Sequence, residues 1–179
     1  AMDYLKNRWL CQDRLNLSDL VRNAIVGKVW EIYENAFDHA DSKVGIFICG
    51  QHFSEEKKLK LAVIDFGMGI PTNVNKYLKQ PKKSAIKSLK WAFESGNSTK
   101  EDCRGLGLDF LKKFVKLNKG SLEIFSERGH VLIKSSAKEI FGNRKNSFQG
   151  TFIYITLNCD NRYYKFVSEP KPTLKEPLF

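Results

Sequence analysis

The sequence lacks a long apolar run, and no stretch approaches the roughly 20 residues that a membrane-spanning helix needs. It also lacks a signal-peptide pattern, because charged residues interrupt the N-terminus from Asp3 to Arg14. Cysteines are few and far apart, and no C-x-x-C pair occurs, which argues against both a zinc site and a disulfide framework. We therefore interpret the sequence as that of a cytoplasmic protein with reduced thiols at Cys11, Cys49, Cys103 and Cys159.

Acidic residues are the minority charge, with 20 Asp and Glu against 30 Lys and Arg, so the chain carries a formal charge of +10. Much of the excess lies between Lys76 and Lys100, where it suits a triphosphate, a nucleic acid or an acidic partner protein, or simply a solvated surface. No zinc finger, RNA-binding aromatic pair or basic-region heptad supports the nucleic-acid option. The length of 179 residues and hydrophobic content of 42% predict one globular domain.

An amphipathic helix is predicted from about Ser18 to Asp41, because apolar residues recur there at steps of three and four. Glu31 and Asn35 stand one turn apart on it, so their side chains project from the same side. A carboxylate and a carboxamide so placed suit a magnesium ion and a water, since hard cations take oxygen ligands. The alternative is a solvated polar face. Gly27 costs this helix roughly 1 kcal/mol relative to alanine, so we expect close packing to require it.

A second motif follows a predicted strand. Leu59–Val63 alternates apolar and polar residues and runs into Ile64–Pro71. Asp65 ends this strand, and a buried carboxylate is costly there unless hydrogen-bond donors meet it. Gly67 and Gly69 would let the backbone come close to a flat ligand.

Together these motifs resemble those of the GHKL superfamily, the ATP-binding domains shared by type II topoisomerases, heat-shock chaperones, histidine kinases and mismatch-repair ATPases. Glu31 and Asn35 match its E-x-x-x-N box. Asp65, Gly67 and Gly69 match its D-x-G-x-G box, with Ile70 following. Two further boxes match in family order: Arg104-Gly105-Leu106-Gly107-Leu108, in the form that histidine kinases use, and the strand opening Gly150-Thr151-Phe152.

The third box opens a helix predicted over 105–118. Glycines at a helix start leave amide groups free, and the helix dipole favours negative charge there, which suits nucleotide phosphates at Gly105 to Leu108. The segment is not a Walker loop, because no G-K-[ST] follows. It also departs from the dinucleotide fingerprint, because Phe110 occupies the third glycine position.

The rest of the pattern predicts a strand over 44–50, a polar loop over 51–57, a helix over 84–94, strands over 121–127, 130–136 and 151–158, and a polar loop over 141–149. The resemblance implies an α/β (α+β) two-layer sandwich, with a mixed, largely antiparallel sheet and helices on one face. We predict an N-terminal strap or helix over 1–17, an ATP-binding domain over 18–158 and a C-terminal tail or linker over 159–179. Residues 72–104 read as an irregular connection and correspond to the family's lid over bound nucleotide.

The resemblance also implies roles for the matched residues. Asp65 would select adenine through its amino group, with Thr151 supporting the same edge through water. Asn35 would be the magnesium ligand and Glu31 the general base. The implied cofactors are ATP and Mg²⁺. The implied nucleotide-binding residues are Asn35, Asp65, Gly67, Gly69, Ile70, Arg104, Gly105, Leu106, Gly107, Leu108 and Thr151.

Three functions are consistent with this resemblance. We expect slow ATP hydrolysis used as a conformational switch. The alternatives are phosphoryl transfer to a His or Ser of a partner protein, and nucleotide sensing without catalysis. His39, His52 and His130 all lie within the ATP-binding body, so a histidine acceptor would have to lie in another chain or a further domain. We therefore expect a partner protein or further domains of a longer chain.

Overall fold

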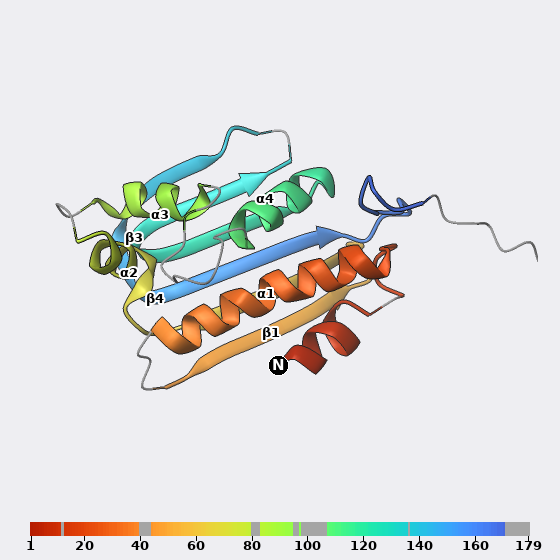
Figure 1. Cartoon of the computed structure of the whole chain (residues 1–179), viewed down its shortest axis with the longest axis horizontal. Helices are drawn as coiled ribbons and strands as arrows, with labels where there is room; N and C mark the ends of the chain where they lie inside the picture. The colour runs from red at the N-terminus through yellow and green to blue at the C-terminus, as the bar shows by residue number, and fades with distance from the viewer. Residues whose placement is uncertain are drawn as a thin grey trace, which may run out of the picture.

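The computed structural model describes residues 1–11, 13–39, 44–79, 83–94, 97, 107–135 and 137–170. Its helical elements are the π-helical turn η1 (Tyr4–Trp9) and the α-helices α1 (Asp19–His39), α2 (Gly69–Leu78), α3 (Ala85–Phe93) and α4 (Gly107–Leu117). Its strands are β1 (Ile46–Phe53), β2 (Lys58–Asp65), β3 (Ser121–Lys134) and β4 (Ile140–Asn158). The helices cover one face of the sheet (Figure 1), which confirms the predicted two-layer α/β sandwich.

The four described strands form one sheet in the order β1-β2-β4-β3, and each neighbouring pair is antiparallel. Two hairpins, β1–β2 and β3–β4, are joined through the pairing of β2 with β4. In that pairing Asp65 lies opposite Thr151. The D-x-G-x-G box and the Gly-Thr-Phe box, far apart in the sequence, therefore meet at one end of the sheet.

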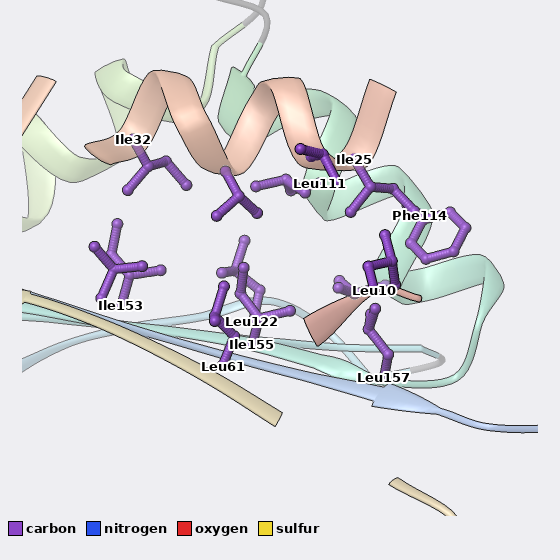
Figure 2. Packing of buried hydrophobic residues seen from close by; sticks show 14 of the residues in the cluster. Leu10, Ile25, Ile32, Leu61, Leu111, Phe114, Leu122, Ile153, Ile155 and Leu157 are labelled. Carbon is purple, nitrogen blue, oxygen red and sulfur yellow. The ribbon is translucent and has the colours of Figure 1, made fainter. Parts of the chain in front are cut away.

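The core lies between the sheet and its helices. Along β2, residues alternate between buried and half-buried, so every second side chain points toward the helical layer. Figure 2 shows side chains from the sheet facing those of α1 and α4: Leu61, Leu122, Ile153, Ile155 and Leu157 from the strands, and Ile25, Ile32, Leu111 and Phe114 from the helices. Each fully buried aliphatic side chain contributes about 1.5–3 kcal/mol, so this layer fixes α1 over the sheet.

Helix α1 confirms the long amphipathic helix predicted from Ser18. The Ser18 hydroxyl accepts a hydrogen bond from the Val21 amide at 3.2 Å and so caps the first turn. The predicted end at Asp41 lies outside the described residues. Gly27 differs from the expectation: a Cβ built there would meet no atom within 4 Å, so close packing does not require glycine at this position.

The N-terminal segment packs against the edge strand β1. The Tyr4 hydroxyl accepts a hydrogen bond from the Gly50 amide at 2.6 Å and donates one to the Gly50 carbonyl at 3.0 Å. Trp9 is buried, and its Nε1 donates to the Lys60 carbonyl at 3.0 Å. A Cβ at Gly50 would stand 2.5 Å from the Trp9 ring, so glycine is required where the N-terminal segment packs against β1.

The chain returns to the same region after β4. Leu17 and Tyr164 form an isolated parallel bridge, the one parallel pairing among the described residues. The Tyr164 amide donates to the Asn16 carbonyl and the Ser18 amide donates to the Tyr164 carbonyl, both at 2.9 Å. The start of the predicted tail over 159–179 therefore packs on the body, whereas residues 171–179 lie outside the described part.

Residues 69–78 correct the sequence prediction, which had an irregular connection after Pro71. They form α2, and α3 follows within the predicted range of 84–94. Asparagines made the segment look irregular, but one of them fixes its end. The Asn75 side chain accepts from the Lys83 amide at 2.8 Å and donates to the Lys83 carbonyl at 3.1 Å, which ties α2 to the start of α3.

The two C-terminal strands are longer than predicted. The turn expected at Gly129 is an irregularity inside β3, with register shifts between Ser126 and Gly129, and the loop expected over 141–149 is part of β4. Residues 143–147 are exposed, which explains why this half of β4 has the polarity of a loop. The predicted strands over 121–127 and 130–136 are therefore one bent strand.

None of the helices in the described part of the chain is long and apolar enough to cross a membrane. Cys11, Cys49 and Cys159 are free, as predicted, and Cys103 lies outside the described residues.

Candidate functional site

Asp65 is the buried carboxylate of the site. It ends β2, retains 4% of its surface exposed, and accepts a hydrogen bond from the Gly67 amide at 2.9 Å. Burial raises the pKa of Asp65, while the Gly67 amide and the amide and hydroxyl of Thr151 oppose that shift. These donors offset part of the cost of burying the Asp65 carboxylate.

Thr151 lies directly opposite Asp65, and the residue before it makes that approach possible. Gly150 has φ +97°, and a Cβ on it would stand 2.1 Å from the Asp65 carbonyl oxygen and 2.7 Å from Phe66 Cα. Only glycine allows β4 to pass this close to the end of β2. The predicted adenine residues Asp65 and Thr151 are thus brought together by the sheet itself.

The glycines of the second box lead from Asp65 into α2. Gly69 has φ +79° and starts the helix, and a Cβ there would stand 2.8 Å from Ser126 Oγ and 3.0 Å from the Gly150 carbonyl oxygen. The Ile70 amide donates to Ser126 Oγ at 2.9 Å. The segment from Gly67 to Ile70 is therefore clamped against β3 and β4, beside Asp65.

Sequence reasoning missed Ser126 and Glu127 of β3. Ser126 is fully buried and its hydroxyl donates to the Gly150 carbonyl at 2.8 Å, next to Thr151. Glu127 Oε1 accepts from the amide and the hydroxyl of Thr72, at 2.8 and 2.7 Å. One signal could have found them: Ser126 stands at an inward position where the alternation through Leu122 and Ile124 calls for an apolar residue.

The E-x-x-x-N box lies toward the C-terminal end of α1, at the same end of the molecule as the end of β2 and the start of α2 (Figure 1). Glu31 has a half-exposed side chain (42%) and pairs with Lys28 at 2.5 Å between Oε1 and Nζ. Asn35 is exposed. Both side chains thus reach solvent at the end of the sandwich where Asp65 lies.

The third box is described only in part. Arg104, Gly105 and Leu106 lie outside the described residues, whereas Gly107 begins α4 and Leu108 packs against the core. Asp109, in the first turn, pairs with Lys113 at 2.8 Å. The predicted phosphate-binding role of this box therefore stays a prediction.

A sequence profile of the family described as histidine kinase-, DNA gyrase B- and HSP90-like ATPases matches residues 17–161. No curated protein gives a match.

Among solved structures, the ATPase and transducer domains of DNA topoisomerase II from Balamuthia mandrillaris align with a TM-score of 0.46 and 13% identity, over 76% of this chain and 37% of that one. The ATPase region of Saccharomyces cerevisiae topoisomerase II bound to ICRF-187 (dexrazoxane) aligns with a TM-score of 0.45 and 14% identity, over the same shares of the two chains. The chain thus spans little more than a third of the length of these structures. Because the family profile covers most of its sequence, the chain belongs to the histidine kinase-, DNA gyrase B- and HSP90-like ATPases, as an ATP-binding domain of the GHKL type.

Proposed function

We propose that the domain binds ATP with magnesium at the Asp65 end of the sheet and hydrolyses it slowly, as a conformational switch. The observation that carries this proposal is the buried Asp65 carboxylate, held opposite Thr151 at the start of a glycine-containing loop. An ionised carboxylate accepts a hydrogen bond, which the N6 amino group of adenine offers and the O6 of guanine does not. The site therefore favours ATP over GTP.

The phosphates would lie toward α4 rather than α2. Two helices begin near the site, and the dipole of each favours an anion at its first turn. The first turn of α2 is already occupied, because Ser126 accepts from the Ile70 amide and Glu127 accepts from Thr72. We therefore assign the phosphates to the third box, Arg104 to Leu108, which leads into α4.

Magnesium would be held by Asn35 together with the phosphates and water. The described residues contain no cluster of three or more His, Cys, Asp or Glu side chains that could form a metal cage. A site with Asn35 as its side-chain ligand fits magnesium, which keeps several waters and is usually bound through one or two side chains plus substrate phosphates. When bound, the ion would neutralise charge on the phosphates. Asn35, exposed on α1, can turn its amide oxygen toward it.

Glu31 would act as the general base. Its carboxylate is half exposed and oriented by Lys28, one turn before Asn35 on the same face of α1. From this position it can take a proton from a water or from the hydroxyl of an acceptor. Removal of that proton is the catalytic step that we assign to Glu31.

Phosphoryl transfer to a His or Ser of a partner protein is the second candidate. The exposure of Glu31 and Asn35 favours it, because an acceptor side chain from another protein could reach them as readily as water. The third box also has the Gly-Leu-Gly-Leu form of histidine kinases. Nucleotide sensing without catalysis is the remaining alternative, and it predicts ATP binding with no turnover and no labelled protein.

Replacing Asp65 by asparagine tests the proposed site. Asp65→Asn should weaken ATP binding by about 10–100-fold, because a hydrogen bond to a charged acceptor contributes about 1.5–3 kcal/mol. Titration calorimetry with Mg-ATP measures the affinity, and the exposed Asp13→Asn serves as control. Wild type should also prefer ATP to GTP. Equal ATP affinity of wild type and Asp65→Asn would contradict the assignment of the adenine site.

The pH dependence of binding follows from the same carboxylate. Burial raises the pKa of Asp65, and adenine requires the ionised form, so affinity should be full above that pKa and fall as pH drops through it. The loss should begin at a higher pH than an exposed aspartate would give. Adenosine is the probe, because it has no phosphate, and NMR titration measures its affinity at pH values above those at which adenine N1 takes up a proton. The affinity of Asp65→Asn should not change with pH, and a matching decline in that variant would exclude Asp65 as the cause.

A further inference from the structure

We propose that Glu127 is a positioning residue for nucleotide binding: it fixes the start of α2, and through it the Gly67–Ile70 segment, against β3, the strand that pairs with Thr151 of β4. This inference rests on the proposed function. Glu127 Oε1 accepts two hydrogen bonds from one residue, the Thr72 amide at 2.8 Å and the Thr72 hydroxyl at 2.7 Å. The two residues are 55 positions apart, so this contact joins distant parts of the chain.

The backbone conformation of Glu127 sets the direction of its side chain. Glu127 has φ +51°, a left-handed conformation that few non-glycine residues adopt. It lies within the irregularity of β3, where the pairing with β4 shifts on both sides of it. Such bulges redirect a side chain that regular alternation would place elsewhere. In this left-handed conformation, the Glu127 carboxylate reaches the amide and hydroxyl of Thr72.

Helix α2 depends on this contact because it has no local cap. Met68 occupies the position before the helix and makes no side-chain capping bond. In the first turn, the Ile70 amide is bonded by Ser126, Pro71 has no amide hydrogen, and the Thr72 amide is bonded by Glu127. Two adjacent residues of β3 therefore supply the acceptors that a local N-cap residue would otherwise provide.

Ser126 and Glu127 together connect the segment that follows Asp65 to the part of β4 that carries Thr151. Ser126 donates to the Gly150 carbonyl, beside Thr151, while accepting from Ile70. Glu127 extends this contact to Thr72, two residues further along α2. Loss of the Glu127 acceptor would leave the Thr72 amide without its partner and allow the Gly67–Ile70 segment to move relative to Asp65 and Thr151.

Three variants test the proposal. Glu127→Leu removes the oxygen that accepts both bonds, and ATP affinity should fall by about 10-fold or more. Glu127→Gln keeps an amide oxygen that can accept both bonds and should stay within about threefold of wild type. Thr72→Val removes the hydroxyl but keeps the amide, so its loss should be intermediate. Glu123→Leu is the matched control, because Glu123 lies on the same strand but bonds His130, and its ATP affinity should be that of wild type.

Calorimetry with Mg-ATP gives the affinities, and circular dichroism shows which variants are folded. If wild type does not bind ATP, the proposed function fails. If wild type binds ATP and Glu127→Leu binds equally well, the proposed function stands and this inference is wrong. A Glu127→Gln variant as weak as Glu127→Leu also overturns it, since acceptance of the Thr72 bonds would then not be the cause. If Glu127→Leu does not fold, Thr72→Val decides, and wild-type affinity in that variant overturns the inference.

Discussion

Glu31→Ala should reduce ATP turnover by about 10²–10⁴-fold, the usual contribution of a general base, and leave ATP affinity nearly unchanged. The reason is the separation of the two functions in the fold. Glu31 lies half exposed on α1 and pairs with Lys28, whereas Asp65 and Thr151 are held by the sheet. Phosphate release measures hydrolysis, transfer of label to added protein measures phosphotransfer, and calorimetry measures affinity.

The neighbouring residues provide the controls for this result. Glu34→Ala should keep wild-type turnover, because Glu34 is an exposed carboxylate of the same helix that belongs to no motif. Asn35→Ala should lower magnesium-dependent affinity and turnover together, as expected for a ligand of the ion. If Glu31→Ala turns over as fast as wild type, the catalytic assignment is wrong even where ATP still binds. Absence of turnover in wild type would instead favour the sensor function.

Gly150→Ala should destabilise the folded domain by about 3 kcal/mol or more. The added Cβ would meet backbone atoms, with the Asp65 carbonyl oxygen at 2.1 Å, and the φ of +97° is itself strained for alanine. Because the clash falls on the residue that we assign to adenine, ATP affinity should fall as well. Urea unfolding followed by circular dichroism measures the free energy of unfolding.

Gly142→Ala is the matched control for that substitution. Gly142 lies in the same strand, β4, and a Cβ there would meet no atom within 4 Å. Its free energy of unfolding should stay within about 1 kcal/mol of wild type, since alanine costs nothing in packing and lowers the freedom of the unfolded chain. Equal stability of Gly150→Ala and wild type would mean that β4 can move away from β2 at little cost.

Local patterns in the sequence predicted the parts of the site that depend on neighbours along the chain. Alternation through Leu59–Val63 predicted β2, and Asp65 followed at its end. Steps of three and four predicted α1, which places Glu31 and Asn35 one turn apart. These features are set by the period of one helix or one strand. They could therefore be predicted without knowing the tertiary structure.

Features that depend on distant contacts could not be predicted in this way. Helix α2 was missed because its first turn is capped by Ser126 and Glu127 rather than by a residue just before it. The role of Glu127 was missed because a bulge, not the alternation of the strand, sets its direction. The pairing of Asp65 with Thr151 followed from the family resemblance and not from the spacing of residues.

The contact between Tyr4 and Gly50 has a consequence for association between chains. Among the described strands, β1 pairs only with β2, so its other side is an edge where a foreign strand could add. The Tyr4 hydroxyl already occupies the amide and the carbonyl of Gly50, in the middle of that edge. A strand from another molecule would have to displace the N-terminal turn before it could continue the ladder. The N-terminal turn thus blocks the addition of a foreign strand at Gly50.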